Sequence, residues 1–191
     1  MRQRTALITT VVVGLILAAC GADKTPETLP PTKPVTTVAT TTTVLDHIEK
    51  AVIDAWIGAT RVLDEAKNSG DYENHPQLKE FYLPGELFQA TKAQLAEERS
   101  RNEKVRYPEP SVSSHEVRVV KIDGITASIT DCFVDDRIVF DGVTGAVLND
   151  EVGTYEQIGE LVRNETTGQW RASGRKTIGE LEGAQRCDSA N

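Results

Sequence analysis

The spacing of apolar residues changes near the middle of the chain, and this change limits the fold more than any other feature. Before Pro108, apolar residues recur at intervals of three and four, which is typical of one face of a helix. This stripe consists of Leu45, Ile48, Val52, Ala55, Ala59, Val62 and Ala66. From Val112 onwards, apolar and polar residues alternate, as in strands with one buried face. Helices followed by antiparallel strands predict an α+β domain, with N-terminal helices packed on a curved antiparallel sheet.

The same patterns predict individual elements. Helices are expected at residues 45–68, 76–82 and 84–103. The charged run 97–104, at the end of the third helix, is interpreted as a solvated face. Strands are expected at residues 112–122, 125–134, 137–140, 152–163 and 169–177. Asp123-Gly124 is a strong signal for a hairpin turn between the first two strands.

The first 20 residues have the parts of a bacterial export signal. Arg2 and Arg4 precede an apolar run at residues 6–17, and the segment Leu-Ala-Ala-Cys ends at Cys20. This segment resembles a lipobox, which implies cleavage of residues 1–19 as a lipoprotein signal peptide and an acyl-bearing lipid on the Cys20 sulfur. The apolar run is shorter than the roughly 20 residues that a spanning helix needs. The alternative is an ordinary secretory signal that happens to be followed by a cysteine. The lipobox places the protein on the extracytoplasmic face of the cell membrane.

Residues 20–44 form a Thr/Pro-rich stretch with four prolines and nine threonines. It has almost no large apolar side chains and cannot bury a core, so we expect a disordered linker. At about 3.1 Å per residue, its full extension would reach roughly 75 Å. Residues 45–191 are then expected to form a single α+β domain.

The net charge of the chain bears on its partners, and its cysteine content bears on a disulfide. Removal of residues 1–19 takes away two arginines and no acids, so the net charge falls from −8 to −10. An acidic surface argues against nucleic acid as a partner. With Cys20 lipidated, Cys132 and Cys187 remain as an even pair in an oxidising compartment, which predicts one disulfide. Two buried free thiols are the alternative.

The order of elements resembles the nuclear transport factor 2-like fold, a cone that wraps a long helix. The lipobox, linker and domain together resemble small actinobacterial surface lipoproteins. The residues that carry the resemblance are Trp56, His75-Pro76-Gln77-Leu78 before Phe81-Tyr82, the run 127–135 around Cys132, Thr144-Gly145, and Trp170-Arg171 before Cys187. The acid–base residues of the isomerases and dehydratases with this fold have no evident counterparts here.

Asp131 is the one weak catalytic candidate. It shares a strand face with Ile129 and Phe133, and a desolvated carboxylate can act as a base. We expect instead that it turns outward to pair with Arg137 or Lys121, with no histidine near it.

No metal site or cofactor is expected. His47, His75 and His115 lack the spacing of metal ligands. The three acids Asp135, Asp136 and Asp141 lack the order of a calcium loop and are interpreted as turn residues.

The sequence therefore favours a non-enzymatic binding or accessory module of the cell envelope. Its expected partners are the membrane, through the lipid anchor, and an envelope protein or a cell-wall component. The alternatives are an isomerase- or lyase-like enzyme that uses the cone pocket, and a carrier of a small apolar ligand. A pocket with convergent polar groups would favour the enzyme, and a dry apolar cavity would favour the carrier.

Overall fold

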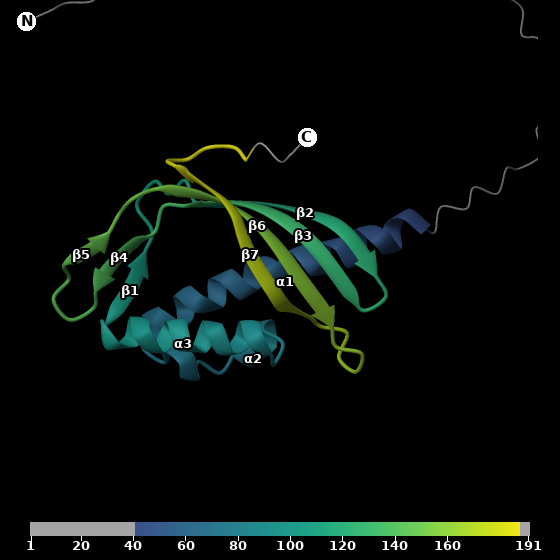
Figure 1. Ribbon diagram of the computed structural model, residues 1–191, viewed down its shortest axis with the longest axis horizontal. Coiled ribbons are helices and arrows are strands. Elements are labelled where there is room, and N and C mark those ends of the chain that lie inside the picture. Colours follow the sequence, from purple (N-terminus) through teal and green to yellow (C-terminus); the bar gives the residue numbers. More distant parts are fainter. Residues whose placement is uncertain (1–40, 188–191) are drawn as a thin grey trace, which may run out of the picture. The chain divides into compact units, whose positions relative to one another are not determined.

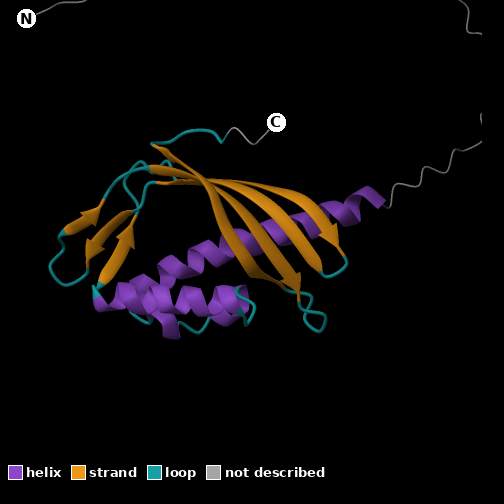
Figure 2. Cartoon of the chain, in the orientation of Figure 1, coloured by secondary structure: helices purple, strands orange, loops and turns teal. Residues whose placement is uncertain are grey.

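The computed structural model describes residues 41–187 (Figure 1). Helices form one layer and antiparallel strands the other (Figure 2). The predicted α+β class is confirmed. The lipobox, Cys20 and nearly all of the expected linker lie outside the described residues.

The helical layer is dominated by one long helix. The helical elements are α1 (Thr41–Ser69), the 3-10 turn η1 (Tyr72–Asn74), α2 (Leu78–Phe81) and α3 (Glu86–Ser100). The long helix begins at Thr41, so the last four residues of the expected linker at 20–44 are helical. It ends at Ser69 because Gly70 follows with a φ of 87°, the left-handed conformation that glycine adopts at helix ends.

The main sheet has four antiparallel strands in the order β2-β3-β6-β7 and arches over α1 (Figure 1). Its strands are β2 (Ser114–Asp123), β3 (Thr126–Asp135), β6 (Gly153–Arg163) and β7 (Trp170–Glu182). The hairpin at Asp123-Gly124 occurs as predicted, with Gly124 at a φ of 60°. One irregularity in β2 lies between Val119 and Lys121 and leaves Val120 without a partner in β3.

A second sheet has the order β1-β4-β5, and the sequence patterns did not predict two of its strands. It consists of β1 (Glu103–Arg106), β4 (Ile138–Asp141) and β5 (Val147–Asn149). The third helix was expected to continue to Glu103, but α3 ends at Ser100, and β1 begins at Glu103 and pairs with β4. Such short strands have too few residues to show an alternating pattern, and pairing with a distant strand determines them.

The core lies between α1 and the inner face of the main sheet, with Trp56 at its centre. The Trp56 side chain is completely buried. A Cβ atom placed on Gly159 of β6 would lie 2.5 Å from Cζ3 of this ring. The ring can therefore lie this close to β6 only because residue 159 has no side chain.

Cys132 and Cys187 are joined in a disulfide, which confirms the predicted pairing. Cys132 lies on the outer face of β3, so the bond holds the segment after β7 against this face. Thr154 adds two hydrogen bonds, because its hydroxyl donates to the Gly183 carbonyl and accepts from the Gln185 N–H. The end of the described chain is thus fixed to β3 and β6.

Replacement of Gly159 by alanine should destabilise the fold by about 1–3 kcal/mol, because the new methyl group must displace the Trp56 ring. Urea unfolding measures the change. The control is Gly174→Ala on β7, where the nearest atom is the flexible carboxylate end of Glu160. Equal unfolding free energies for the two variants would show that the contact between Trp56 and Gly159 does not limit packing.

Candidate functional site

Asp131 points toward α1 and is only 1% exposed, so the expectation that it turns outward is wrong. Its expected partners are engaged elsewhere: Arg137 binds Asp135 and Asp64, and Lys121 binds Asp123. The carboxylate of Asp131 is therefore part of the buried layer between α1 and the sheet.

Two ring nitrogens meet at Asp131. Trp56 donates its indole N–H to Oδ2 at 2.7 Å, and His115 Nδ1 lies 2.8 Å from the same oxygen. The His115 ring stacks on Phe133, with ring centroids 4.2 Å apart. The sequence analysis expected no histidine near Asp131, and His115 overturns this expectation. The other oxygen, Oδ1, is buried without a hydrogen-bond partner among the described residues.

The irregularity at Val120 explains why the sequence did not show this contact. At the hairpin, Asp123 pairs with Thr126, and an unbroken register would place His115 opposite Val134, on the outer face. Because Val120 is left out of the pairing, His115 lies opposite Phe133 instead, on the same face as Asp131. The alternating pattern carries a trace of this bulge, because the inward apolar residues change from odd positions at Val117 and Val119 to an even position at Ile122.

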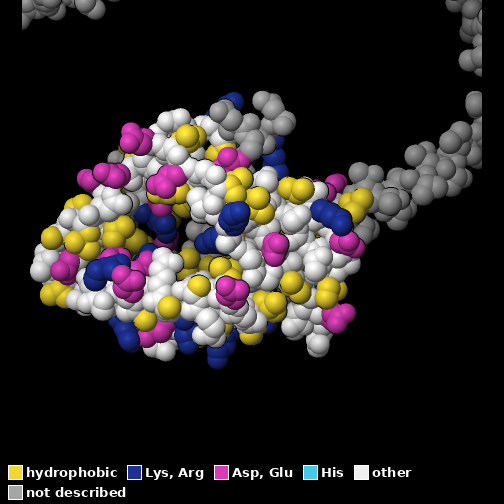
Figure 3. All heavy atoms as spheres, in the orientation of Figure 1, with side chains coloured by type: hydrophobic (Ala, Val, Ile, Leu, Met, Phe, Trp, Pro, Cys, Tyr) yellow, Lys and Arg dark blue, Asp and Glu magenta, His cyan; other side chains and the backbone are white. Residues whose placement is uncertain are grey.

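A second group of functional side chains surrounds a cavity of about 360 Å³ between the helices and the inner face of the main sheet. Its polar lining comes from α1, α3, β3, β6, β7 and the loop after β3, and consists of Thr60, Lys67, Gln94, Asp135, Arg137, Gln157, Arg175 and Thr177. The space-filling view shows a hollow on this face of the molecule with basic side chains inside it (Figure 3). Neither Asp131 nor His115 lines this cavity.

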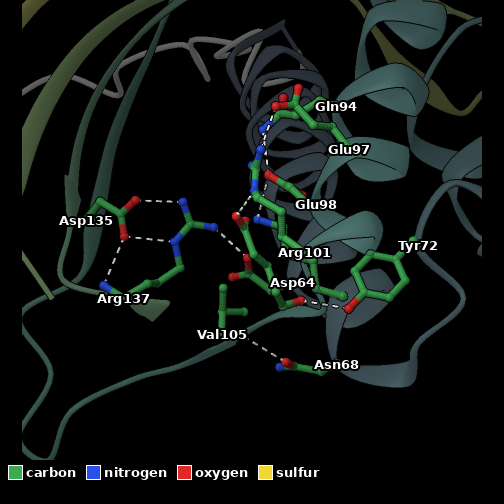
Figure 4. A network of polar contacts seen from close by, with 12 residues as sticks. Asp64, Asn68, Tyr72, Gln94, Glu97, Glu98, Arg101, Val105, Asp135 and Arg137 are labelled. Carbon is green, nitrogen blue, oxygen red and sulfur yellow. Dashed lines mark hydrogen bonds and ion pairs between the residues drawn. The ribbon is translucent and has the colours of Figure 1, made fainter. Parts of the chain in front are cut away.

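Two carboxylates neutralise the charge of Arg137 at the edge of the cavity (Figure 4). Its guanidinium donates to Asp135 Oδ1 at 2.8 Å and Oδ2 at 2.6 Å, and to Asp64 Oδ1 at 2.5 Å. Burial opposes the charge of Arg137, but the two carboxylates outweigh it and raise the pKa of the guanidinium above its usual value. Burial also acts against the Asp135 carboxylate, yet Arg137 lowers the pKa of that group. Two carboxylates thus share one cation.

Lys67 is neutralised by a carboxylate from another helix. Its ammonium lies 3.2 Å from Glu98 Oε1, and the two side chains are only 9% and 8% exposed. Gln94 also donates to Glu98 Oε1, at 2.9 Å. This pair connects α1 to α3 at the wall of the cavity.

Arg175 differs from the other two cations of the cavity. Its guanidinium carbon lies 4.6 Å from the centre of the Trp56 ring, and Nη2 donates to the Thr60 hydroxyl at 3.2 Å. Within residues 41–187, no carboxylate lies within ion-pair distance of it, and its Nε is buried without a partner. Arg175 is half-buried, and a partly desolvated cation without a counter-charge contributes little to stability, so this is the cation of the cavity that remains available to a ligand.

The residues that the sequence analysis considered for metal binding lie apart. His47 is exposed on α1, and His75 follows η1. Asp136 accepts a hydrogen bond from the Ser111 hydroxyl. Asp141 accepts from backbone N–H groups in the turn after β4, and these bonds lower the pKa of its carboxyl. In the part of the chain that the structure describes, no group of acids, histidines and cysteines could hold a metal ion.

Known proteins offer little guidance. No protein family and no curated protein matches this sequence. Among solved structures, the crystal structure of the intermembrane space region of chloroplast protein ARC6 is similar, with a TM-score of 0.43 and 15% identity over 63% of this chain and 91% of that chain. A similarity this low carries no argument about function. None of the helices within residues 41–187 has the length and apolar character needed to cross a membrane.

Substitution of Asp131 by asparagine should lower the free energy of unfolding by about 1–3 kcal/mol, because the amide replaces a carboxylate on which two buried ring nitrogens converge. Chemical denaturation followed by tryptophan fluorescence measures this change. Asp123→Asn is the matched control, since that carboxylate is exposed and pairs only with Lys121. A loss no larger than that of the control would mean that Trp56 and His115 do not depend on the charge of Asp131.

Proposed function

We propose that this protein is a lipid-anchored extracytoplasmic lipoprotein whose domain binds a small polar molecule without transforming it. The domain is of the nuclear transport factor 2-like kind, and its cavity is the mouth of the cone. The binding module serves the cell envelope, together with an envelope protein or a cell-wall component.

The observation that carries this proposal is the composition of the cavity. Its volume of about 360 Å³ lies within the range of small-molecule sites. Charged and amide side chains line most of it, which disfavours the carrier of an apolar ligand. The pair of a carboxylate and a histidine in the described main sheet, Asp131 with His115, does not line it. A catalytic group must touch its substrate, so this cavity is better suited to binding than to catalysis.

Two further features support the fold and the location. A four-stranded antiparallel sheet arched over one long helix is the arrangement expected of a cone. The segment ending at Cys20 has the order of a lipobox, and the mature acidic chain has no polybasic stretch that would bind an anionic membrane by itself.

An isomerase- or lyase-like enzyme is the second candidate, because His115 and Asp131 lie 2.8 Å apart. In such a pair, an aspartate orients a histidine that then acts as a base. The Asp131→Asn variant separates the two candidates. A binding module retains its ligand in proportion to the fraction of folded protein, whereas an enzyme that uses the carboxylate loses its activity while folded.

Replacement of Cys20 by alanine should abolish lipid attachment, because the thiol is the acylation site of a lipobox. Metabolic labelling with palmitate and membrane fractionation test this expectation. Cys187→Ala serves as the control, since it also removes one cysteine but leaves Cys20 intact. Normal label in the Cys20→Ala protein would overturn the lipoprotein assignment.

Native mass spectrometry of the full chain, purified from its own envelope, should detect a retained small molecule. Gln157→Trp should displace this molecule, because residue 157 lines the cavity. The matched control is Ile158→Trp, the next residue of β6, which is 39% exposed on the outer face.

The wild-type chain and the Ile158→Trp chain should therefore carry the molecule, and the Gln157→Trp chain should not. A co-purified protein with no small molecule would instead favour a pure protein-binding module. Equal retention by both tryptophan variants would place the ligand outside this cavity.

A further inference from the structure

We propose that the ligand of the cavity is a small polar monocarboxylate, held through a direct contact between its carboxylate and Arg175. This inference rests on the proposed binding function and adds the chemical class of the ligand. It follows from a comparison of the three cations of the cavity and of the acidic partner that each one has or lacks.

Only one of the three cations of the cavity has no acidic partner in the described chain. Lys67 is paired with Glu98, and Arg137 is paired with Asp135 and Asp64. Arg175 has neither an ion pair nor a partner for its buried Nε. A bound carboxylate would supply the missing counter-charge, and it would do so where the protein has already excluded much of the water.

Arg175 is also held in a position suited to this contact. Asp131 fixes the indole of Trp56 by its hydrogen bond, and the face of Trp56 carries the guanidinium. The hydroxyl of Thr60, on α1, accepts a hydrogen bond from Nη2 of Arg175. A planar guanidinium presents pairs of N–H donors that match the two oxygens of a carboxylate. Its side chain is therefore ordered before the ligand arrives, which reduces the cost of binding.

The surrounding charges favour a single negative charge on the ligand. Beyond Arg175, both cations of the cavity are already neutralised: Asp135 and Asp64 bind Arg137, and Glu98 lies beside Lys67, although only Asp135 of these acids lines the cavity. A second anionic group on the ligand would find, among the cavity residues that the structure describes, no further unpaired cation to offset the loss of its hydration. Sulfate and dicarboxylates are therefore poor ligands.

The uncharged residues that line the cavity favour a ligand with polar groups in addition to its carboxylate. Gln94, Gln157 and Thr177 present amide and hydroxyl groups to the cavity. A ligand with hydroxyl groups can hydrogen-bond to them, whereas an apolar ring would leave them unpaired. Hydroxy acids and sugar acids fit both this lining and the volume of the cavity.

The test is calorimetric titration of the full chain with matched acids and amides. The probes are lactate and lactamide, glucuronate and glucuronamide, benzoate and benzamide, and sulfate. At least one of the two polar acids, lactate or glucuronate, should bind at least tenfold tighter than its own amide, and tighter than benzoate or sulfate. Arg175→Met should remove this preference.

The matched control is Lys176→Met, which removes the same charge from the next residue of β7, where the side chain is exposed. It should leave the affinity for the acids within twofold of wild type. If Arg175→Met does not fold, Arg175→Lys replaces it, since lysine keeps the charge but lacks the planar pair of donors. That variant should weaken the preference for the acid without abolishing it.

Several results would overturn the proposal. They are equal affinity of both polar acids and their amides for the wild-type chain, equal losses in the Arg175→Met and Lys176→Met chains, or tighter binding of sulfate or benzoate. A less stable Arg175→Met protein that still prefers the acid would assign Arg175 to the packing of Trp56 alone. A neutral molecule retained in native mass spectrometry would refute the carboxylate while the binding function stands.

Discussion

The packing of Trp56 is the constraint on which the rest of the structure depends. A buried indole must place a large ring in the core and also find an acceptor for its N–H. Gly159 makes room for the ring, and Asp131 accepts the hydrogen bond. The contacts of Trp56 with Asp131 and Gly159 hold α1 against β3 and β6. Arg175, which lines the cavity, lies over the same indole ring. One side chain thus connects the core of the fold to the candidate binding site.

The sequence predicts the layers of the fold because each depends on a local period. The stripe on α1 correctly identifies Val52, Ala59 and Val62 as buried, and the count of cysteines leads to the observed disulfide. The surroundings of Asp131 depend instead on strand register. A single unpaired residue, Val120, moves His115 from the outer face to the inner one. The change of phase between Val119 and Ile122 is a weak sign of the bulge, but it does not show where His115 lies relative to Asp131, so this contact was missed.

The cavity could not be predicted for a different reason. Asp64 and Lys67 lie at the edge of the apolar stripe of α1, and a helical period separates apolar residues from polar ones. It cannot separate polar residues that face water from those that face a cavity. Their partners, Arg137 and Glu98, come from other elements, and Arg137 is 73 residues away from Asp64. Arg175 was missed because its distinguishing property is the lack of an acidic partner, which only the folded arrangement reveals.

The disulfide has a mechanical consequence. Tension applied between α1 and Cys187 passes from Cys132 directly to Cys187 through the sulfur–sulfur bond. The chain between the two cysteines forms a closed loop that carries none of this load, and it contains β4, β5, β6 and β7. Arg137, Gln157 and Arg175 all lie within this loop. A pull along the chain would therefore act on the segment from α1 to Cys132, while the strands that form most of the cavity wall remain covalently shielded from the force.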